Sequence, residues 1–166
     1  MYLLKPISHD SVTGALAKAE RYRLLNEPGE AESICRDILE IEPGNQTALI
    51  TLILALTDQI GDHPRAFDDA KAIADLLESA YDRAYYAGIA WERRAKSRHY
   101  GGGHNSHRYA YDWLVTALEL FANAERLRLA GNDDAILRWN ACVRYLAGHK
   151  DLVPVPEERP EPIVSE

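Results

Sequence analysis

Several residue types and sequence features are scarce in this chain of 166 residues. It contains two cysteines, two phenylalanines and one methionine, and no apolar run is long enough for a membrane span of about 20 residues. The start of the chain lacks the basic segment and apolar stretch of a signal peptide. Cys35 and Cys142 form no CxxC pair or disulfide framework, so we expect buried, reduced thiols. These absences predict a cytoplasmic protein that does not bind membranes.

Motifs of common catalytic and nucleotide-binding sites are also missing. The sequence has no nucleophile motif, no GxxxxGK phosphate loop, no dinucleotide fingerprint and no HExxH zinc motif. We therefore expect a protein that is not an enzyme and has no cofactor. The formal net charge of −7 argues against general binding of nucleic acid, because affinity for phosphates needs a field of the opposite sign.

What the sequence does contain is helical periodicity. The chain is 46% hydrophobic and 27% charged, as is usual for a globular protein, and its apolar residues recur at steps of three and four. Glycine- or proline-rich breaks interrupt this pattern. An all-α fold is predicted, with helices over residues 8–26, 29–42, 46–60, 64–79, 81–98, 107–129 and 133–147. Residues 1–148 form one helical domain in this interpretation, and the proline-rich, acidic residues 149–166 form an extended, mobile tail.

The first two predicted helices carry a specific pattern. Ala19 and Ala31 occupy positions where two helices approach closely, Tyr22 follows one turn after Ala19, and Pro43 ends the unit. With Cys35, Ile38, Leu39, Ile41 and Asn45, this segment resembles one repeat of the tetratricopeptide (TPR) family, which has a period of about 34 residues. The match runs over residues 12–45 without a gap.

Two further units resemble the same family more weakly. The second covers residues 46–80, where Ile53 replaces the usual small residue, and the third has Gly88 and Trp91 at the close-contact and aromatic positions. A long insertion separates the two helices of the third unit. The resemblance implies an α-solenoid of about three helical hairpins, and the last helix resembles a C-terminal cap. We expect Trp91 and Trp139 to belong to the core.

In TPR arrays the first helices of the hairpins line a concave face that binds partner segments. By this resemblance the partner-binding groove is formed by Leu16, Glu20, Arg23, Ile50, Leu54, Asp58, Tyr85, Tyr86, Ile89 and Arg93. The lysine and asparagine residues with which some family members bind a terminal carboxylate are missing, because Leu16 and Glu20 stand at two of their positions. An apolar helix or extended segment is therefore the better candidate ligand.

A second candidate site is a basic, glycine- and histidine-rich segment. No acidic residue lies between Arg93 and Arg108. Its candidate residues are Arg94, Arg98, His99, Tyr100, His104, His107 and Arg108. Arginines bind carboxylates and phosphates with two parallel hydrogen bonds, whereas the alternative interpretation is a solvated connector. The histidines suit a metal site less well than a solvated surface, because neither cysteine lies near them in the sequence and no carboxylate falls between them.

These observations favour a protein-interaction scaffold or adaptor. Its concave groove binds a protein or peptide segment, and the basic loop forms a rim or lid. Two alternatives are a sensor that binds a small molecule or a nucleotide-like anion, and an accessory subunit of an enzyme complex. Nucleic acid is not expected as a partner, because no recognisable RNA- or DNA-binding motif accompanies the basic segment.

Overall fold

The computed structural model describes residues 2–154, and within this range the chain contains seven α-helices, one short 3-10 helix and no strand. The predicted all-α fold is confirmed. The helices are α1 (Val12–Leu24), α2 (Pro28–Ile41), α3 (Gln46–Asp58), α4 (Ala66–Ala74), α5 (Ala80–Gly101), α6 (Ser106–Leu127) and α7 (Asp134–Gly148), and the 3-10 helix His9–Ser11 precedes α1.

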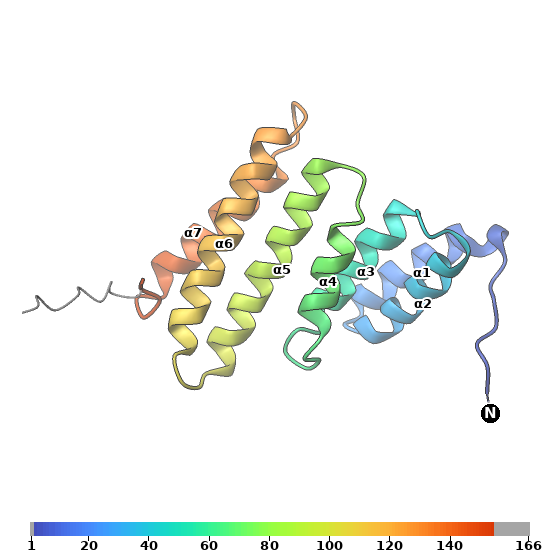
Figure 1. Ribbon diagram of the computed structural model, residues 1–166, viewed down its shortest axis with the longest axis horizontal. Coiled ribbons are helices and arrows are strands. Elements are labelled where there is room, and N and C mark those ends of the chain that lie inside the picture. The colour runs from blue at the N-terminus through green and yellow to red at the C-terminus, as the bar shows by residue number, and fades with distance from the viewer. Residues whose placement is uncertain (1, 155–166) are drawn as a thin grey trace, which may run out of the picture.

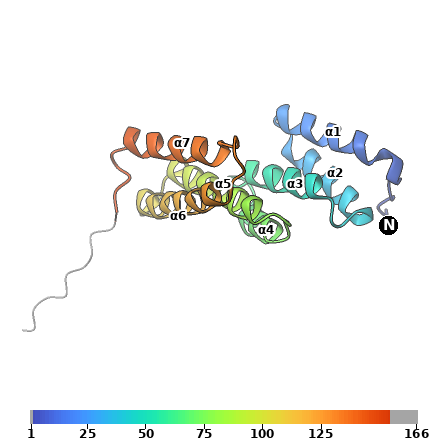
Figure 2. The ribbon, with the colours of Figure 1, turned by 90° about the horizontal axis from the view of Figure 1, so that it is seen from above.

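Each helix packs against the next one along the chain, and the molecule is elongated as a result (Figure 1). In addition, α3 contacts both α1 and α5. Seen from above, α1 and α7 lie on one side of the molecule, α4 and α6 lie on the other, and α3 and α5 run between them (Figure 2). The central helices α3 and α5 therefore lie between elements from both ends of the chain.

The helix ends follow from local sequence chemistry. Pro28 starts α2, where its missing N–H is not needed. The side chain of Asn45 accepts a hydrogen bond from the Ala48 N–H at 2.9 Å and caps α3, and Ser79 caps α5 through the Asp82 N–H at 3.2 Å. Between α6 and α7, Gly131 has a φ of 86°, a conformation that glycine adopts without strain.

The fourth helix is shorter than its predicted range of residues 64–79. It ends at Ala74, and Leu77 then turns into the core with only 2% of its surface exposed. The Arg83 guanidinium donates hydrogen bonds to the carbonyls of Leu77 at 2.6 Å and Glu78 at 2.9 Å. These bonds satisfy backbone groups outside the helix, so the early end carries little cost.

The expected loop over residues 99–106 is the largest departure from the sequence prediction. Helix α5 continues to Gly101, α6 starts at Ser106, and the connection is only four residues long. Gly102 and Gly103 have positive φ values of 65° and 97°, and Asn105 also has a positive φ of 54°. The insertion therefore lengthens both helices to 22 residues, and the prediction of a long basic loop is wrong.

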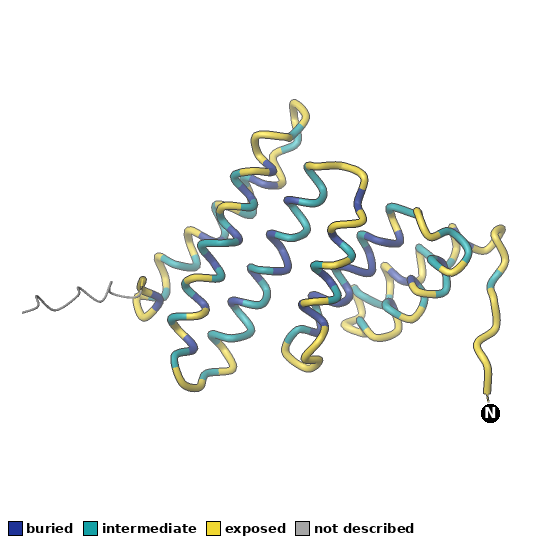
Figure 3. Tube along the Cα trace, viewed as in Figure 1, coloured by how far each residue is buried: buried dark blue, intermediate teal, exposed yellow. Residues whose placement is uncertain are grey.

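The buried positions lie along the faces where neighbouring helices meet (Figure 3), and several of them are small residues. Ala19 and Ala31 are fully buried in one cluster, together with Leu52 and Ile53. In the α5–α6 pair, a Cβ atom added to Gly88 would lie 2.6 Å from Cε1 of Phe121, which is itself fully buried. Glycine at position 88 therefore allows α5 and α6 to approach closely.

Two further expectations concern the C-terminal part of the chain. Leu152 is 5% exposed and packs into the cluster that contains Ile89 and Cys142, so the expectation that the tail separates from the fold at residue 149 is wrong for this segment. Residues 155–166 of the expected tail lie outside the described part. Trp91 is partly buried between two core clusters, but Trp139 is 36% exposed on α7, so its assignment to the core is also wrong.

Candidate functional site

Three predicted groove residues meet in one ion cluster. The Asp58 carboxylate on α3 accepts a hydrogen bond from Nε of Arg23 on α1 at 2.9 Å and forms an ion pair with Arg93 on α5. All three side chains are partly buried, with exposures between 20% and 29%. Burial, together with the charges of Arg138 and Arg23, lowers the pKa of Arg93 to about 10, so Arg93 remains charged at neutral pH. The cluster links α1, α3 and α5.

A cavity of about 400 Å³ lies next to this cluster. It is bounded by the C-terminal ends of α1 and α3, by the start of the α3–α4 turn and by the C-terminal half of α5. Its lining residues include Arg23, Asn26, Asp58, Arg93, Lys96 and Ser97. Because one carboxylate faces three cationic side chains here, the cavity has a positive character in an acidic chain.

A second ion cluster joins α5 to α7. The Glu92 side chain is 3% exposed, and its carboxylate accepts a hydrogen bond from Lys96 Nζ at 2.6 Å and another from Nη1 of Arg138 at 3.4 Å. Burial disfavours the charge of Arg138, but Glu92 and a hydrogen bond with Tyr85 outweigh this effect and raise its pKa. Together the two clusters contain four cationic side chains and two carboxylates.

Apolar and aromatic groove residues surround Ile89. Leu54, Tyr85 and Tyr86 are partly buried and pack against the cluster that contains it, with the two tyrosine rings 5.1 Å apart in an edge-on arrangement. Burial raises the pKa of Tyr86 to about 12, and the nearby Asp82 carboxylate adds to this effect. Ile89 itself is 1% exposed, so the expectation that it faces the groove is wrong. Ile89 belongs to the buried cluster against which the two tyrosines pack.

The remaining groove candidates lie in different surroundings. Ile50 is partly buried and packs against the cluster around Leu52. Leu16 packs in a separate cluster near the N-terminal end with Val12 and Ile38, and Glu20 is exposed on α1. The structure therefore brings together the candidates from the C-terminal end of α1, from α3 and from α5, while Leu16 belongs to another cluster.

Two arginines of the basic segment are held by aromatic rings. The Arg94 guanidinium carbon lies 3.9 Å from the ring centroid of Phe67 and 4.3 Å from that of Trp113. The Arg98 guanidinium lies 5.8 Å from the Tyr109 ring and donates a hydrogen bond to the His104 carbonyl at 3.1 Å. Arg94 and Arg98 thus contact residues of α4, of α6 and of the α5–α6 connection, whereas Arg93 pairs with Asp58.

His99 is a structural link between α5 and the C-terminal segment. Its Nδ1 atom lies 2.7 Å from the Tyr145 hydroxyl, and its Nε2 atom lies 2.8 Å from the Asp151 carboxylate. The His99 side chain is only 13% exposed, so its expected place on a solvated surface is wrong. Burial raises the pKa of the Tyr145 hydroxyl, which makes it a poor nucleophile at neutral pH despite this arrangement.

The other residues of the basic segment are more accessible. Tyr100 at the end of α5, His104 in the connection and His107 on α6 are exposed, and Arg108 is partly buried. The seven candidates thus surround the α5–α6 tip on several sides and do not form one continuous patch. Within residues 2–154, no group of three histidine, cysteine or acidic side chains is arranged to hold a metal ion.

Sequence reasoning missed Glu92, Arg138 and Trp113 as members of these sites. Glu92 and Lys96 are spaced as an exposed helical ion pair, and this spacing hid the burial of the carboxylate. A signal was present, because position 92 continues, at helical steps, the stripe formed by the half-buried Tyr85 and the buried Ile89. Arg138 and Trp113 lie far from their partners in the sequence, so only the folded chain reveals these contacts.

No described helix is both long and apolar enough to cross a membrane. Comparison with protein families, with curated proteins and with solved structures finds no match for this chain.

Proposed function

We propose that this chain is a non-catalytic scaffold of the TPR type that binds an acidic segment of a partner protein between α1, α3 and α5. The observation that carries this proposal is the cluster of Arg23, Asp58 and Arg93 beside the cavity of about 400 Å³. These residues come from the three helices that line the concave face by the TPR resemblance. The full burial of Ala19 and Ala31 is the packing that the first repeat requires, and it supports the resemblance.

The chemistry of the groove favours a ligand that is both acidic and apolar. Arg23, Arg93 and Lys96 line the cavity, and their three positive charges exceed the two negative charges of Asp58 and of Glu92, which pairs with Lys96. A carboxylate of a partner segment is attracted to this excess and can accept bidentate hydrogen bonds from an arginine. Leu54 and Tyr86 lie nearby on α3 and α5 and provide partly exposed apolar area for neighbouring side chains. Aromatic residues of this kind often contribute most of the binding energy.

The proposed role does not include a flexible lid. The α5–α6 connection has only four residues between the two long helices, and Arg94 and Arg98 are held by aromatic rings. None of the seven candidates of the basic segment lines this cavity, which Arg93, Lys96 and Ser97 reach from α5. Recognition in the groove is therefore assigned to a largely preformed surface, which lowers the entropic cost of binding.

The test is a selection of binding segments from a random peptide library displayed against the full chain. We expect the selected segments to combine acidic with apolar residues. Their affinity should fall by at least about tenfold in the triple variant Arg23→Gln, Asp58→Asn, Arg93→Gln, because charge-assisted hydrogen bonds contribute about 1.5–3 kcal/mol each. This variant keeps side chains that hydrogen-bond and leaves no unpaired charge in the cluster.

The matched control is Arg36→Gln on α2, which removes an exposed arginine that pairs with Glu32 four residues away. The control should bind the selected segments as the wild-type chain does. Helical content and unfolding midpoint are measured for all variants, so that a loss of binding is separated from a loss of structure. Selected segments that bind the triple variant as tightly as the wild type would place the ligand elsewhere and overturn the proposal.

A further inference from the structure

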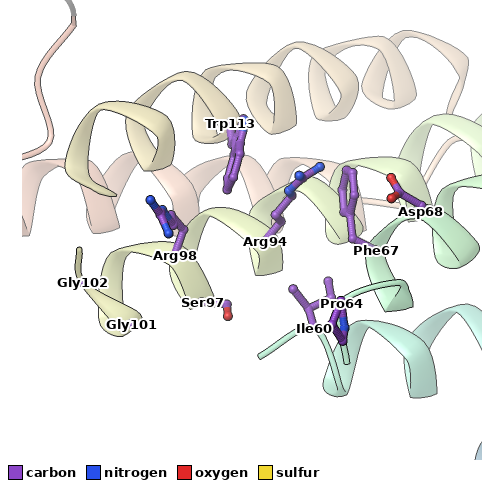
Figure 4. Close-up of a pocket in the computed structure, with 10 residues that line it drawn as sticks. All are labelled: Ile60, Pro64, Phe67, Asp68, Arg94, Ser97, Arg98, Gly101, Gly102 and Trp113. Atoms are coloured by element: carbon purple, nitrogen blue, oxygen red, sulfur yellow. The ribbon is translucent and has the colours of Figure 1, made fainter. Parts of the chain in front are cut away.

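A second pocket, of about 250 Å³, lies beside the α3–α4 turn (Figure 4). The two pockets share Ile60 and Ser97 in their walls. The second pocket is also lined by Phe67 and Asp68 of α4, by Arg94 and Arg98 of α5, by Trp113 of α6, and by residues of the α3–α4 turn and of the end of α5. The side chains of Arg94 and Arg98 stand near the Trp113 ring in this view.

The geometry of Arg94 leaves only part of its guanidinium available to a ligand. Its central carbon lies close to the Phe67 and Trp113 rings, at 3.9 and 4.3 Å from their centroids, and the two aromatic contacts hold the group in place. None of the ion pairs among residues 2–154 involves Arg94. Its N–H donors are thus positioned without a carboxylate partner, as bidentate recognition of an anion requires.

Arg98 brings a second guanidinium to the same pocket. It lies one helical turn after Arg94, so both side chains leave α5 on the same face. One of its nitrogens donates to the His104 carbonyl, which fixes the side chain and leaves other donors of the guanidinium available. Lys71 adds positive charge nearby, because its Nζ lies 5.3 Å from the centroids of the Phe67 and Trp91 rings.

We infer that the pocket between Arg94 and Arg98 binds a phosphate monoester, supplied either by a small molecule or by a phosphorylated side chain. A phosphate monoester carries close to two negative charges near neutral pH and offers three terminal oxygens, so both guanidinium groups have an acceptor. The double negative charge of the phosphate matters because Asp68 also lines the pocket, and its carboxylate repels an anion that binds the two arginines less strongly. A stacked nucleobase is a poorer fit, because Arg94 already occupies the space against the Phe67 and Trp113 rings.

This site is independent of the proposed groove, because its arginines do not contact Asp58. The full chain is titrated with inorganic phosphate, with O-phosphoserine and with a short phosphoserine peptide, by calorimetry and by NMR of the Arg94 side chain and the Trp113 indole N–H. We expect saturable binding that perturbs both signals. Arg94→Lys should weaken binding by at least about tenfold, because lysine keeps the charge but loses the planar fork.

The comparison of probes identifies the source of the phosphate. Tighter binding of the peptide than of the two small probes assigns the site to a phosphorylated side chain, and equal or tighter binding of the small probes assigns it to a small molecule. Asp68→Asn should strengthen binding because it removes a repulsive carboxylate. Arg36→Lys is the matched control on exposed α2 and should leave the affinity unchanged. Circular dichroism checks that each variant keeps the wild-type fold.

Two results would overturn the inference. One is the absence of saturable binding for all three probes up to about 20 mM, a concentration at which even weak sites with millimolar Kd are filled. The other is equal affinity of the wild type and a folded Arg94→Lys variant, which would mean that phosphate senses only the general positive charge at this end of α5.

Discussion

The two halves of the molecule, α1–α4 and α5–α7, pack their helices through different kinds of residue. In α1–α4 the helices meet through small and aliphatic side chains, and Ala19, Ala31 and Ala55 are fully buried. In α5–α7 the helices are longer and the buried set includes Glu92, the one charged residue buried within residues 2–154. Cationic side chains of α5 and α7 pair with it. The first half is therefore organised by side-chain size, and the second by size and charge together.

This contrast indicates where the chain tolerates change. An apolar core responds to added or removed volume, because protein interiors are closely packed. A buried carboxylate responds to the loss of its partners, because an unpaired charge away from water is costly. The two candidate sites lie at the junction of the two halves. Arg23 and Asp58 come from the first half, while Arg93, Arg94 and Arg98 come from α5.

The largest expected effect tests the buried charge of the second half. Changing Lys96 and Arg138 together to methionine leaves the Glu92 carboxylate buried without a cation. We expect the free energy of unfolding to fall by about 3–5 kcal/mol, as for other broken buried ion pairs. Urea unfolding at neutral pH measures this loss.

The control adds Glu92→Leu to the same two changes. The resulting apolar triple variant should recover most of the lost stability, because well-packed apolar side chains replace buried ion networks at little cost. If the double variant is as stable as the wild type, the carboxylate reaches water and the packing of α7 on α5 differs from this structure.

A smaller effect is expected where the second half depends on size. Gly88→Ala places a methyl group within 2.8 Å of two ring atoms of Phe121, whose ring is fully buried and cannot move aside freely. Overpacking of this kind costs about 1–3 kcal/mol, which outweighs the gain of about 1 kcal/mol in helix propensity. The unfolding midpoint should fall, and Phe121→Leu should restore part of it in the double variant. A higher midpoint for Gly88→Ala would mean that α5 and α6 are further apart.

The sequence predicted the helices well because their signals are local. Apolar steps of three and four, and proline or glycine at the breaks, defined seven helices. The prediction failed where tertiary contacts override local preference. Helix α4 ends early because Leu77 is buried in the core beyond its last turn. Helix α5 continues through His99 because the His99 side chain interacts with Tyr145 and Asp151.

The candidate sites were predictable only in part. Arg23, Asp58 and Arg93 were found because the repeat pattern aligns positions on successive first helices, and the structure joins them. Arg93 and Arg94 lie within the predicted helix over residues 81–98 and were assigned to different sites, Arg93 to the groove and Arg94 to the basic segment. Neighbouring residues of a helix point about 100° apart, and in the structure the two arginines line different pockets.

Alkaline pH tests a property that the two halves share. Cys35 and Cys142 are fully buried, and burial raises the pKa of each thiol to about 12. The unfolded thiols ionise near pH 8.5, so the unfolded state loses protons first and stability falls as pH rises toward 12. Each thiol should contribute a slope of about −1.4 kcal/mol per pH unit above pH 9.

Urea unfolding between pH 8 and 9.5 measures this slope, because the unfolded form of Tyr86, with a pKa of about 10, is still mostly protonated in this range. Cys35→Ala and Cys142→Ala should each reduce the slope by the contribution of one proton, although each also shifts stability at neutral pH. Equal reductions indicate that the cores of both halves exclude water alike. A slope that Cys142→Ala leaves unchanged would show that the interior of the second half is hydrated around its ions.

The smallest expected effect is a change in the free energy of unfolding opposite in sign to the one predicted for Gly88→Ala. Gly14 lies in α1, and a Cβ atom added there meets no other atom within 4 Å. Gly14→Ala should therefore raise the free energy of unfolding by about 0.5–1 kcal/mol, through helix propensity alone. The unfolding midpoints of the two glycine variants, measured under the same conditions, should move in opposite directions. A loss of stability in Gly14→Ala would mean that the exposed face of α1 is packed against another part of the chain, and that the first half depends on close contacts beyond those in its core.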